Sequence, residues 1–225
     1  MSASVSAAEM GSGISGSSSG MGNKTNGWAS SKVIGLLGFG LTMVLFGLAN
    51  LPNPYAKGFL IPGTVGIWTT IGMATIFGGA IVVLAGLIDL WRGHLYWGSA
   101  FLGLGAFWLA YTSTSGSLVT YFGGAAGTAP AYGMAAFWFV WMLFALTFLI
   151  SSMKHGWMTF FLFLFLVVGF ILLIIEFWQV GAANSISSGE RWAVGGELVV
   201  TGLIAWYSAT AELTNATYSK RLLPG

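Results

Sequence analysis

Residues 77–108 read FGGAIVVLAGLIDLWRGHLYWGSAFLGLGAFW, two apolar runs joined by a short polar hinge at residues 89–94. Both runs extend beyond this stretch, to the length of about 20 residues that a membrane-spanning helix needs. Trp91, Tyr96 and Trp97 flank the hinge, and such side chains are typical anchors at a membrane–water interface. The stretch therefore predicts a helical hairpin that crosses a membrane, with its hinge at the surface.

Four glycines in and around this hairpin recur every seven residues, at positions 72, 79, 86 and 93. Seven residues are nearly two turns of an α-helix, so we expect these glycines on one slowly drifting face. Small residues on one face let helix backbones approach closely inside a membrane. Helix packing is the expected role of the glycines, and lining of a pore is the alternative.

The composition of the whole chain is also that of a membrane protein. Of the 225 residues, 56% are hydrophobic and 6% are charged, whereas about 25% are charged in soluble domains. The absence of cysteine excludes a disulfide framework and a thiolate metal site. Residues 1–30 are rich in Ser, Gly and Ala, which predicts a disordered cytoplasmic tail before a transmembrane domain at residues 31–225.

Six apolar segments of spanning length follow the tail, at residues 33–51, 63–88, 95–114, 131–152, 157–180 and 192–211. The polar segments between them include residues 115–130 and 181–189, which we expect to be loops. Six basic residues fall on the side of the two termini and two on the other side, so both termini are predicted to be cytoplasmic. The predicted fold is all-α, a bundle of six transmembrane helices.

Ionisable side chains within the spans are candidates for function, because they are costly in lipid. Asp89 is expected at a cytoplasmic helix end, where its spacing to Arg92 favours an ion pair. Glu176 and Glu197 are expected toward the outer ends of their spans, so no acid lies at the centre of a predicted span. This argues against a carboxylate proton relay, but not against a proton that travels with its substrate as a neutral acid.

The sequence favours transport over chemistry. Motifs of hydrolases, zinc proteases and nucleotide-binding loops are missing, and the two histidines lie in separate hinges. We therefore expect no enzymatic activity, no cofactor, no metal and no nucleic-acid partner. A small anion that crosses lipid needs fixed dipoles in place of water. Hydroxyl groups within the spans, among them Thr42 and Tyr207, are candidates to supply them.

Short motifs in the same order resemble those of the acetate uptake transporter family, also called the succinate–acetate permease family. The first span begins with GLLGFGLT at residues 35–42 and ends near Asn50, where the family has an asparagine, and the resemblance makes Asn50 a further candidate for the path. The remaining motifs are FGG at 77–79, AG at 85–86, RG at 92–93, GAFW at 105–108 and AELTN at 211–215. The family's entry motif NPAPLG is replaced here by SSKVIG at residues 30–35.

The resemblance implies a homo-oligomer, a hexamer in the family, with a path for acetate through each protomer. Succinate and other small carboxylates are further candidate substrates. By resemblance, Phe39 and Leu104 belong to a constriction, with Leu104 in place of a tyrosine, and Leu166 and Ala205 match positions linked to substrate choice. An ion channel and a proton-coupled carrier both remain open. The alternatives are a channel for a small neutral solute, such as ammonia, and a non-transporting membrane sensor or subunit.

Overall fold

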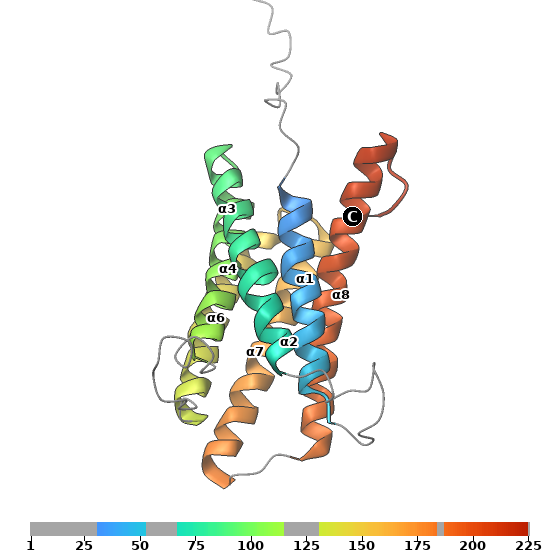
Figure 1. Cartoon of the computed structure of the whole chain (residues 1–225). Coiled ribbons are helices and arrows are strands. Elements are labelled where there is room, and N and C mark those ends of the chain that lie inside the picture. The colour runs from blue at the N-terminus through green and yellow to red at the C-terminus, as the bar shows by residue number, and fades with distance from the viewer. Residues whose placement is uncertain (1–30, 53–66, 115–130, 184–186, 225) are drawn as a thin grey trace, which may run out of the picture.

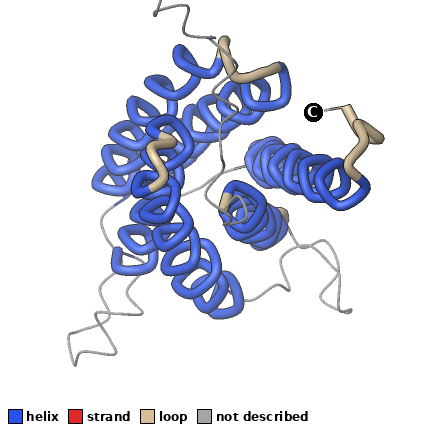
Figure 2. Tube along the Cα trace, turned by 90° about the horizontal axis from the view of Figure 1, so that it is seen from above, coloured by secondary structure: helices blue, strands red, loops and turns tan. Residues whose placement is uncertain are grey.

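The computed structural model describes residues 31–52, 67–114, 131–183 and 187–224, and within these ranges all regular elements are helices. The helices run up and down in alternation and form one bundle (Figure 1). Their axes are tilted against one another, as the view from above shows (Figure 2). The elements are α1 (Lys32–Asn50), α2 (Ile67–Met73), the π-helix η1 (Ala74–Ile81), α3 (Val82–Trp91), α4 (Leu95–Thr114), α6 (Ala131–Ser152), α7 (Trp157–Ala183) and α8 (Ser188–Tyr218).

Each of the six predicted segments is helical in the described residues, because α2, η1 and α3 follow one another without a break. The bounds of α4 and α6 agree with the predicted residues 95–114 and 131–152. By length and apolar composition, four described helical stretches could cross a membrane: α1, residues 69–91, α6 and α7. The predicted tail at residues 1–30 and the predicted loop at residues 115–130 lie outside the described residues.

The predicted loop at residues 181–189 is wrong at both ends, because α7 continues to Ala183 and α8 begins at Ser188. Gly181 packs against the ring of Tyr132 in α6, which keeps α7 in contact with its neighbour. A capping box starts α8: Ser187 Oγ accepts from the Glu190 N–H at 3.2 Å, and Glu190 Oε2 accepts from the Ser187 N–H at 2.9 Å. Ser187 and Glu190 both precede the apolar run that defined the predicted span, which begins at residue 192.

The predicted end of the last span at residue 211 is also wrong, because α8 continues for two more turns to Tyr218. Ser219 then adopts a left-handed conformation with φ 51° and ends the helix. Asn215 holds the chain that follows: its Nδ2 donates to the Leu223 carbonyl at 2.8 Å, and its Oδ1 accepts from the Leu222 and Leu223 N–H groups. The polar end of α8 is thus ordered by side-chain hydrogen bonds.

The hinge between α3 and α4 has the predicted structure. The Asp89 side chain is 1% exposed, and its Oδ1 lies 3.4 Å from His94 Nδ1 and 4.0 Å from Arg92 Nη1. Gly93 has a φ of +82°, a conformation that a residue with a Cβ rarely adopts. The predicted pairing of Asp89 with Arg92 is therefore confirmed.

The predicted common face of the four glycines is wrong. Gly79 and Gly86 pack against α4, but a Cβ on Gly72 would have no neighbour within 4 Å, and Gly93 lies in the hinge. The reason is η1, whose wider turns with i→i+5 hydrogen bonds interrupt the α-helical spacing between Gly72 and Gly79. Packing is confirmed as the role of the two central glycines only.

The most extensive packing between described helices is that of α1 with α8, which lie side by side (Figure 1). A Cβ on Gly40 would lie 2.8 Å from the Gly202 carbonyl oxygen, and a Cβ on Gly47 would lie 2.8 Å from that of Gly195. Backbones at this distance gain dispersion contacts and leave no room for side chains. On α8, the apolar side chains of Trp192, Leu203 and Trp206 are exposed, as expected for a surface toward lipid or another protomer.

Candidate functional site

Polar side chains follow one face of α8 along its whole length. Glu190, Glu197, Thr201, Ser208 and Glu212 are spaced by seven, four, seven and four residues. Such heptad-like spacing keeps residues on one helical face. This face is half-buried or buried, whereas the opposite face is exposed. A polar face turned into a bundle of apolar helices marks the surroundings of α8 as the candidate site.

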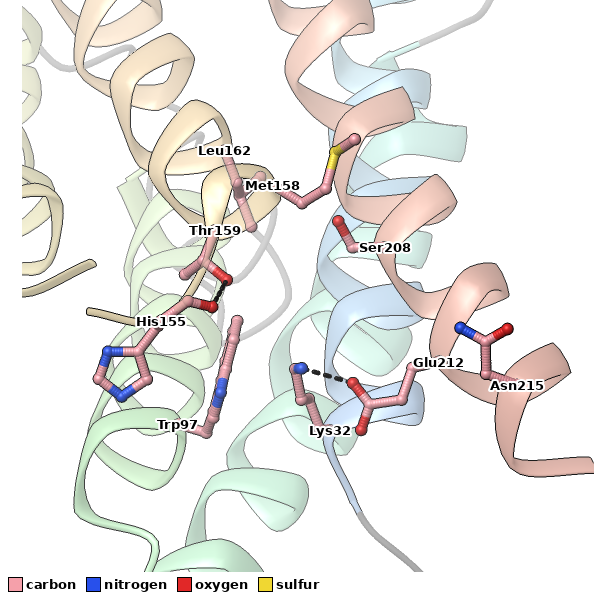
Figure 3. Close-up of a pocket in the computed structure, with 9 residues that line it drawn as sticks. All are labelled: Lys32, Trp97, His155, Met158, Thr159, Leu162, Ser208, Glu212 and Asn215. Carbon is pink, nitrogen blue, oxygen red and sulfur yellow. Dashed lines mark hydrogen bonds and ion pairs between the residues drawn. The ribbon is translucent and has the colours of Figure 1, made fainter. Parts of the chain in front are cut away.

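A polar cavity on this face lies at the end of the bundle that we call the basic end, where Lys32, Arg92, Lys154, Lys220 and Arg221 are found (upper end of Figure 1). The cavity has a volume of about 250 Å³. Its lining comes from α1, α4, α7, α8 and the α6–α7 hinge: Lys32, Trp97, His155, Met158, Thr159, Leu162, Ser208, Glu212 and Asn215 (Figure 3).

Lys32 supplies a positive charge beside this cavity. Its Nζ lies 2.5 Å from Glu212 Oε2 and 4.7 Å above the centre of the Trp97 ring. The pair joins α1 to α8, as Figure 3 shows. Both side chains are a little under a third exposed, so water reaches the pair and an entering anion can reach Lys32. The hydroxyls of Ser208 and Thr159 donate back to backbone carbonyls, of Ile204 and His155 respectively.

The cavity leads toward an apolar layer. Leu166 lies one turn inward from the lining residue Leu162, and Ala205 lies one turn inward from Ser208. Leu166 and Ala205 are 0% exposed and belong to the same buried apolar cluster as Phe39 and Leu104. Four of the residues that the resemblance assigned to the path and its constriction thus belong to one extended buried cluster, with one residue each on α1, α4, α7 and α8.

Beyond this layer the α7–α8 interface is polar again. Glu197 Oε1 accepts a hydrogen bond of 2.7 Å from Thr201 Oγ1. A small cavity of about 50 Å³ follows toward the opposite end of the bundle, lined by Glu176, Glu190 and apolar side chains of α7 and α8. The interface thus has a cavity near each end, with the apolar layer and Glu197 between them.

Glu197 is not placed as the sequence predicted. We expected it toward the outer end of its span, but its carboxyl packs against Gly169, close to the centre of the 27-residue α7. The prediction rested on the length of the apolar run in α8 alone. The neighbouring helix extends well beyond that run, so the carboxyl lies deep within the α7–α8 interface.

The other three predicted residues lie away from the α7–α8 interface or outside its cavities. Thr42 is fully buried but faces η1 and Trp108, since a Cβ on Gly78 would lie 2.7 Å from its Oγ1. Asn50 Nδ2 donates to the Phe46 carbonyl within its own helix at 2.7 Å. Tyr207 is half-buried and lines neither of the two cavities. The structure does not bring these three side chains to one place.

Several residues of the site did not follow from reading the spans one at a time. Lys32, Trp97 and Glu212 line the basic-end cavity, although each marks the end of a helix in the sequence. The heptad-like spacing of polar residues in α8 was the available signal for Glu212. No local feature of the sequence indicates that Lys32 and Trp97 lie close to Glu212. In the described part of the chain, no three His, Asp or Glu side chains are close enough to hold a metal ion.

Comparison with known proteins agrees with this architecture. The GPR1/FUN34/yaaH family model matches residues 18–224. The succinate-acetate/proton symporter SatP of Escherichia coli is 27% identical over 85% of this chain and 92% of its own length. Ammonia transport outward protein 2 of Saccharomyces cerevisiae is 31% identical over 83% of this chain and 62% of its own length.

A solved structure also has the same fold. The bacterial acetate channel SatP superposes with a TM-score of 0.73 at 25% identity, over 88% of this chain and 98% of that chain. The apolar helical bundle, the order of the motifs and the family match over nearly the whole described chain all point the same way. This chain therefore belongs to the GPR1/FUN34/yaaH family.

Proposed function

We propose that this protein carries acetate across a cell membrane, along a path within one chain between α1, α4, α7 and α8. The observation that carries this proposal is the α7–α8 interface, with a cavity near each end and an apolar layer between them. Relatives named as a succinate-acetate/proton symporter and an acetate channel support acetate as the substrate. Their names also support transport in place of enzymatic conversion.

The protein is a multi-pass membrane protein, because its apolar helices have spanning length and its relatives are membrane transporters and channels. We infer that all six helical segments cross the membrane, including α4 and α8, which are less apolar than the other four. Their polar and small residues face the bundle interior, so these residues are not exposed to lipid. The basic residues at one end of the bundle support a cytoplasmic location for that end, and with it for both termini.

The proposed path treats the anion in three stages. Lys32 attracts the carboxylate at the basic-end cavity, where the charge is still hydrated. Phe39, Leu104, Leu166 and Ala205 form a narrow apolar constriction that accepts the methyl group of acetate and hinders longer acids. Thr201 and Glu197 then offer polar groups on the far side. Succinate, with two carboxylates, is the larger candidate substrate.

Flux of labelled acetate into proteoliposomes tests the proposal. The membrane potential is set with potassium and valinomycin at either sign, first without and then with a pH gradient. Flux that follows the potential identifies a channel for the acetate anion, and flux that follows only the pH gradient identifies proton-linked transport. Flux at the level of protein-free liposomes under both conditions would contradict acetate transport.

A channel for a neutral solute is the second candidate function. The yeast relative named ammonia transport outward protein 2 favours it, as does the apolar character of the constriction. Shrinkage and recovery of the same proteoliposomes in ammonium and glycerol solutions would reveal such a channel. Solute entry above the leak without any acetate flux would favour this function, and the absence of both would favour a non-transporting subunit.

We further propose that the protein is a homo-oligomer, a hexamer by resemblance to its family. Exposed apolar side chains of α3 and α6, among them Leu84, Leu87, Phe139 and Val140, offer surfaces for contacts between protomers. Native mass spectrometry from detergent gives the number of protomers directly. A monomer under conditions that preserve transport would contradict this proposal.

A further inference from the structure

Glu197 is a half-buried residue of α8 whose carboxyl group packs against Gly169 of α7. Its Oε1 accepts the hydrogen bond from Thr201. Its Oε2 is buried and, among the residues described, has no hydrogen-bond partner. A buried carboxyl oxygen needs either a donor from its surroundings or a proton of its own. The arrangement around Oε2 therefore leaves a place for a proton.

Gly169 of α7 makes room for this carboxyl group. A Cβ at Gly169 would overlap Glu197 Oε2 and would lie 3.1 Å from Glu197 Cδ. Only a residue without a side chain lets Oε2 reach the backbone of α7 at this point. The site is therefore formed by two helices, and a change in α7 can alter the carboxyl group of α8.

The helices packed on α8 bring no cation to this carboxyl group within the described residues. α1 has no titratable side chain after Lys32, and Lys32 pairs with Glu212 at the basic end. The titratable group of α7 is Glu176, which is also an acid. On α8 itself the nearest charged groups are Glu190 and Arg191, about two turns away toward the opposite end. Among the residues that the structure describes, a negative charge on Glu197 would thus have no close counter-ion.

The position of Glu197 lies along the proposed path. It is one turn inward from Val194, which lines the small cavity at the opposite end. Its partner Thr201 is one turn from Ala205 in the constriction. A solute that passes from the small cavity to the constriction must therefore pass this carboxyl group.

We propose that Glu197 is the proton-binding residue that couples the movement of the carboxylate to a proton, an inference that rests on the proposed function. Oε2 takes a proton from water in the small cavity, acetate passes beside the neutral acid, and the proton leaves toward the basic-end cavity. One acetate anion and one proton cross together, so no net charge moves. Ionised Glu197 excludes acetate, because like charges repel strongly where the dielectric constant is low.

Glu197→Gln tests the coupling, because glutamine keeps the shape of the side chain but does not titrate. In proteoliposomes with a pH gradient, we expect the variant to lose uphill accumulation of labelled acetate by about tenfold or more. Exchange of labelled for unlabelled acetate at equal pH needs no net proton movement and should stay measurable.

Uphill accumulation by Glu197→Gln at the level of the unchanged protein would overturn the inference. So would acetate flux in the unchanged protein that follows the membrane potential and ignores the pH gradient. If the unchanged protein carried no acetate at all, the proposed function would fail, and this failure is distinct because it precedes any comparison of variants.

Infrared difference spectra of the full-length protein between acidic and alkaline pH test proton binding without any substrate. We expect a carbonyl band of a protonated carboxylic acid that is missing in Glu197→Gln and shifted in Gly169→Ala, whose methyl group displaces the carboxyl. If Glu197→Gln does not fold, the shift of the band in Gly169→Ala still tests whether Glu197 binds the proton. Identical spectra in the unchanged protein and both folded variants would overturn the inference whatever the transport assays give.

Discussion

Leu166 is the residue whose size we expect to limit the width of the path. It is fully buried and lies one turn inward from the basic-end cavity. Leu166→Ala should raise the uptake of butyrate relative to acetate by about tenfold or more, because one methylene group in an apolar pocket already changes discrimination by about that factor. Labelled uptake into proteoliposomes measures this ratio. Ile171→Ala, on the exposed face of α7, is the control, and an unchanged ratio in Leu166→Ala would remove Leu166 from the path.

Lys32 is the residue that we expect to attract the anion at the basic end. Lys32→Gln should raise the KM for acetate entering from that end by about twofold to fivefold, since partly exposed ion pairs contribute about 0.2–1 kcal/mol. The effect should shrink in high salt, which screens the charge. Initial rates against acetate concentration give the KM. Lys154→Gln, an exposed lysine of the same end, should leave it unchanged, and an equal change in both variants would point to general surface charge.

At the scale of elements, the contact between α1 and α8 is the most extensive one between described helices, so we expect it to contribute to the stability of the bundle. A Cβ on Gly202 would lie 2.6 Å from the Gly40 carbonyl oxygen and 2.6 Å from the Val44 nitrogen, so the two backbones must separate. Gly202→Ala should lower the free energy of unfolding by about 1–3 kcal/mol. Thermal unfolding in detergent measures the change. Gly196→Ala on the same helix meets no atom within 4 Å and should unfold as the unchanged protein does.

The start of α8 should respond to pH. Hydrogen bonds, first from the Ser187 side chain and then from its backbone N–H, hold the pKa of the Glu190 carboxyl below its ordinary value of 4.5. Because the pKa is lowered in the folded state, the ionised carboxyl of Glu190 stabilises the start of α8 at pH above about 4.5. This stabilisation is lost as the pH falls through the folded pKa. Hydrogen exchange, corrected for intrinsic rates, should show a less protected first turn at acidic pH. Ser187→Ala should lose protection at neutral pH and respond less to acid.

At the scale of the whole molecule, the absence of cysteine in the chain makes its orientation directly measurable. Single cysteines replace Ser187 at one end of the bundle and Ser219 at the other, where both side chains are exposed. In intact cells, an impermeant maleimide should label the cysteine at position 187 and reach the one at position 219 only after lysis. Labelling in the reverse order would contradict the cytoplasmic location of both termini.

The sequence predicted the helices of this molecule well, because the length of an apolar run and the glycine or charge that ends it are local properties. α4 and α6 have the predicted bounds, and the Asp89 hinge has its predicted ion pair. The errors lie where local signals conflict or are weak. η1 breaks the spacing between Gly72 and Gly79, and polar capping residues extend α8 beyond its apolar run.

By itself, the sequence determined that the chain is an all-helical membrane protein with short hinges and a family resemblance to acetate carriers. The composition decides that it is a membrane protein, because so few charges cannot cover a surface in water, and the length of the apolar runs indicates helices. Only the tertiary structure decided which residues share a site. Lys32 and Glu212 are 180 positions apart, and Glu197 fits beside Gly169 of another helix. Such pairs depend on how two helices are rotated and displaced against each other, which is set by the packing of all their neighbours.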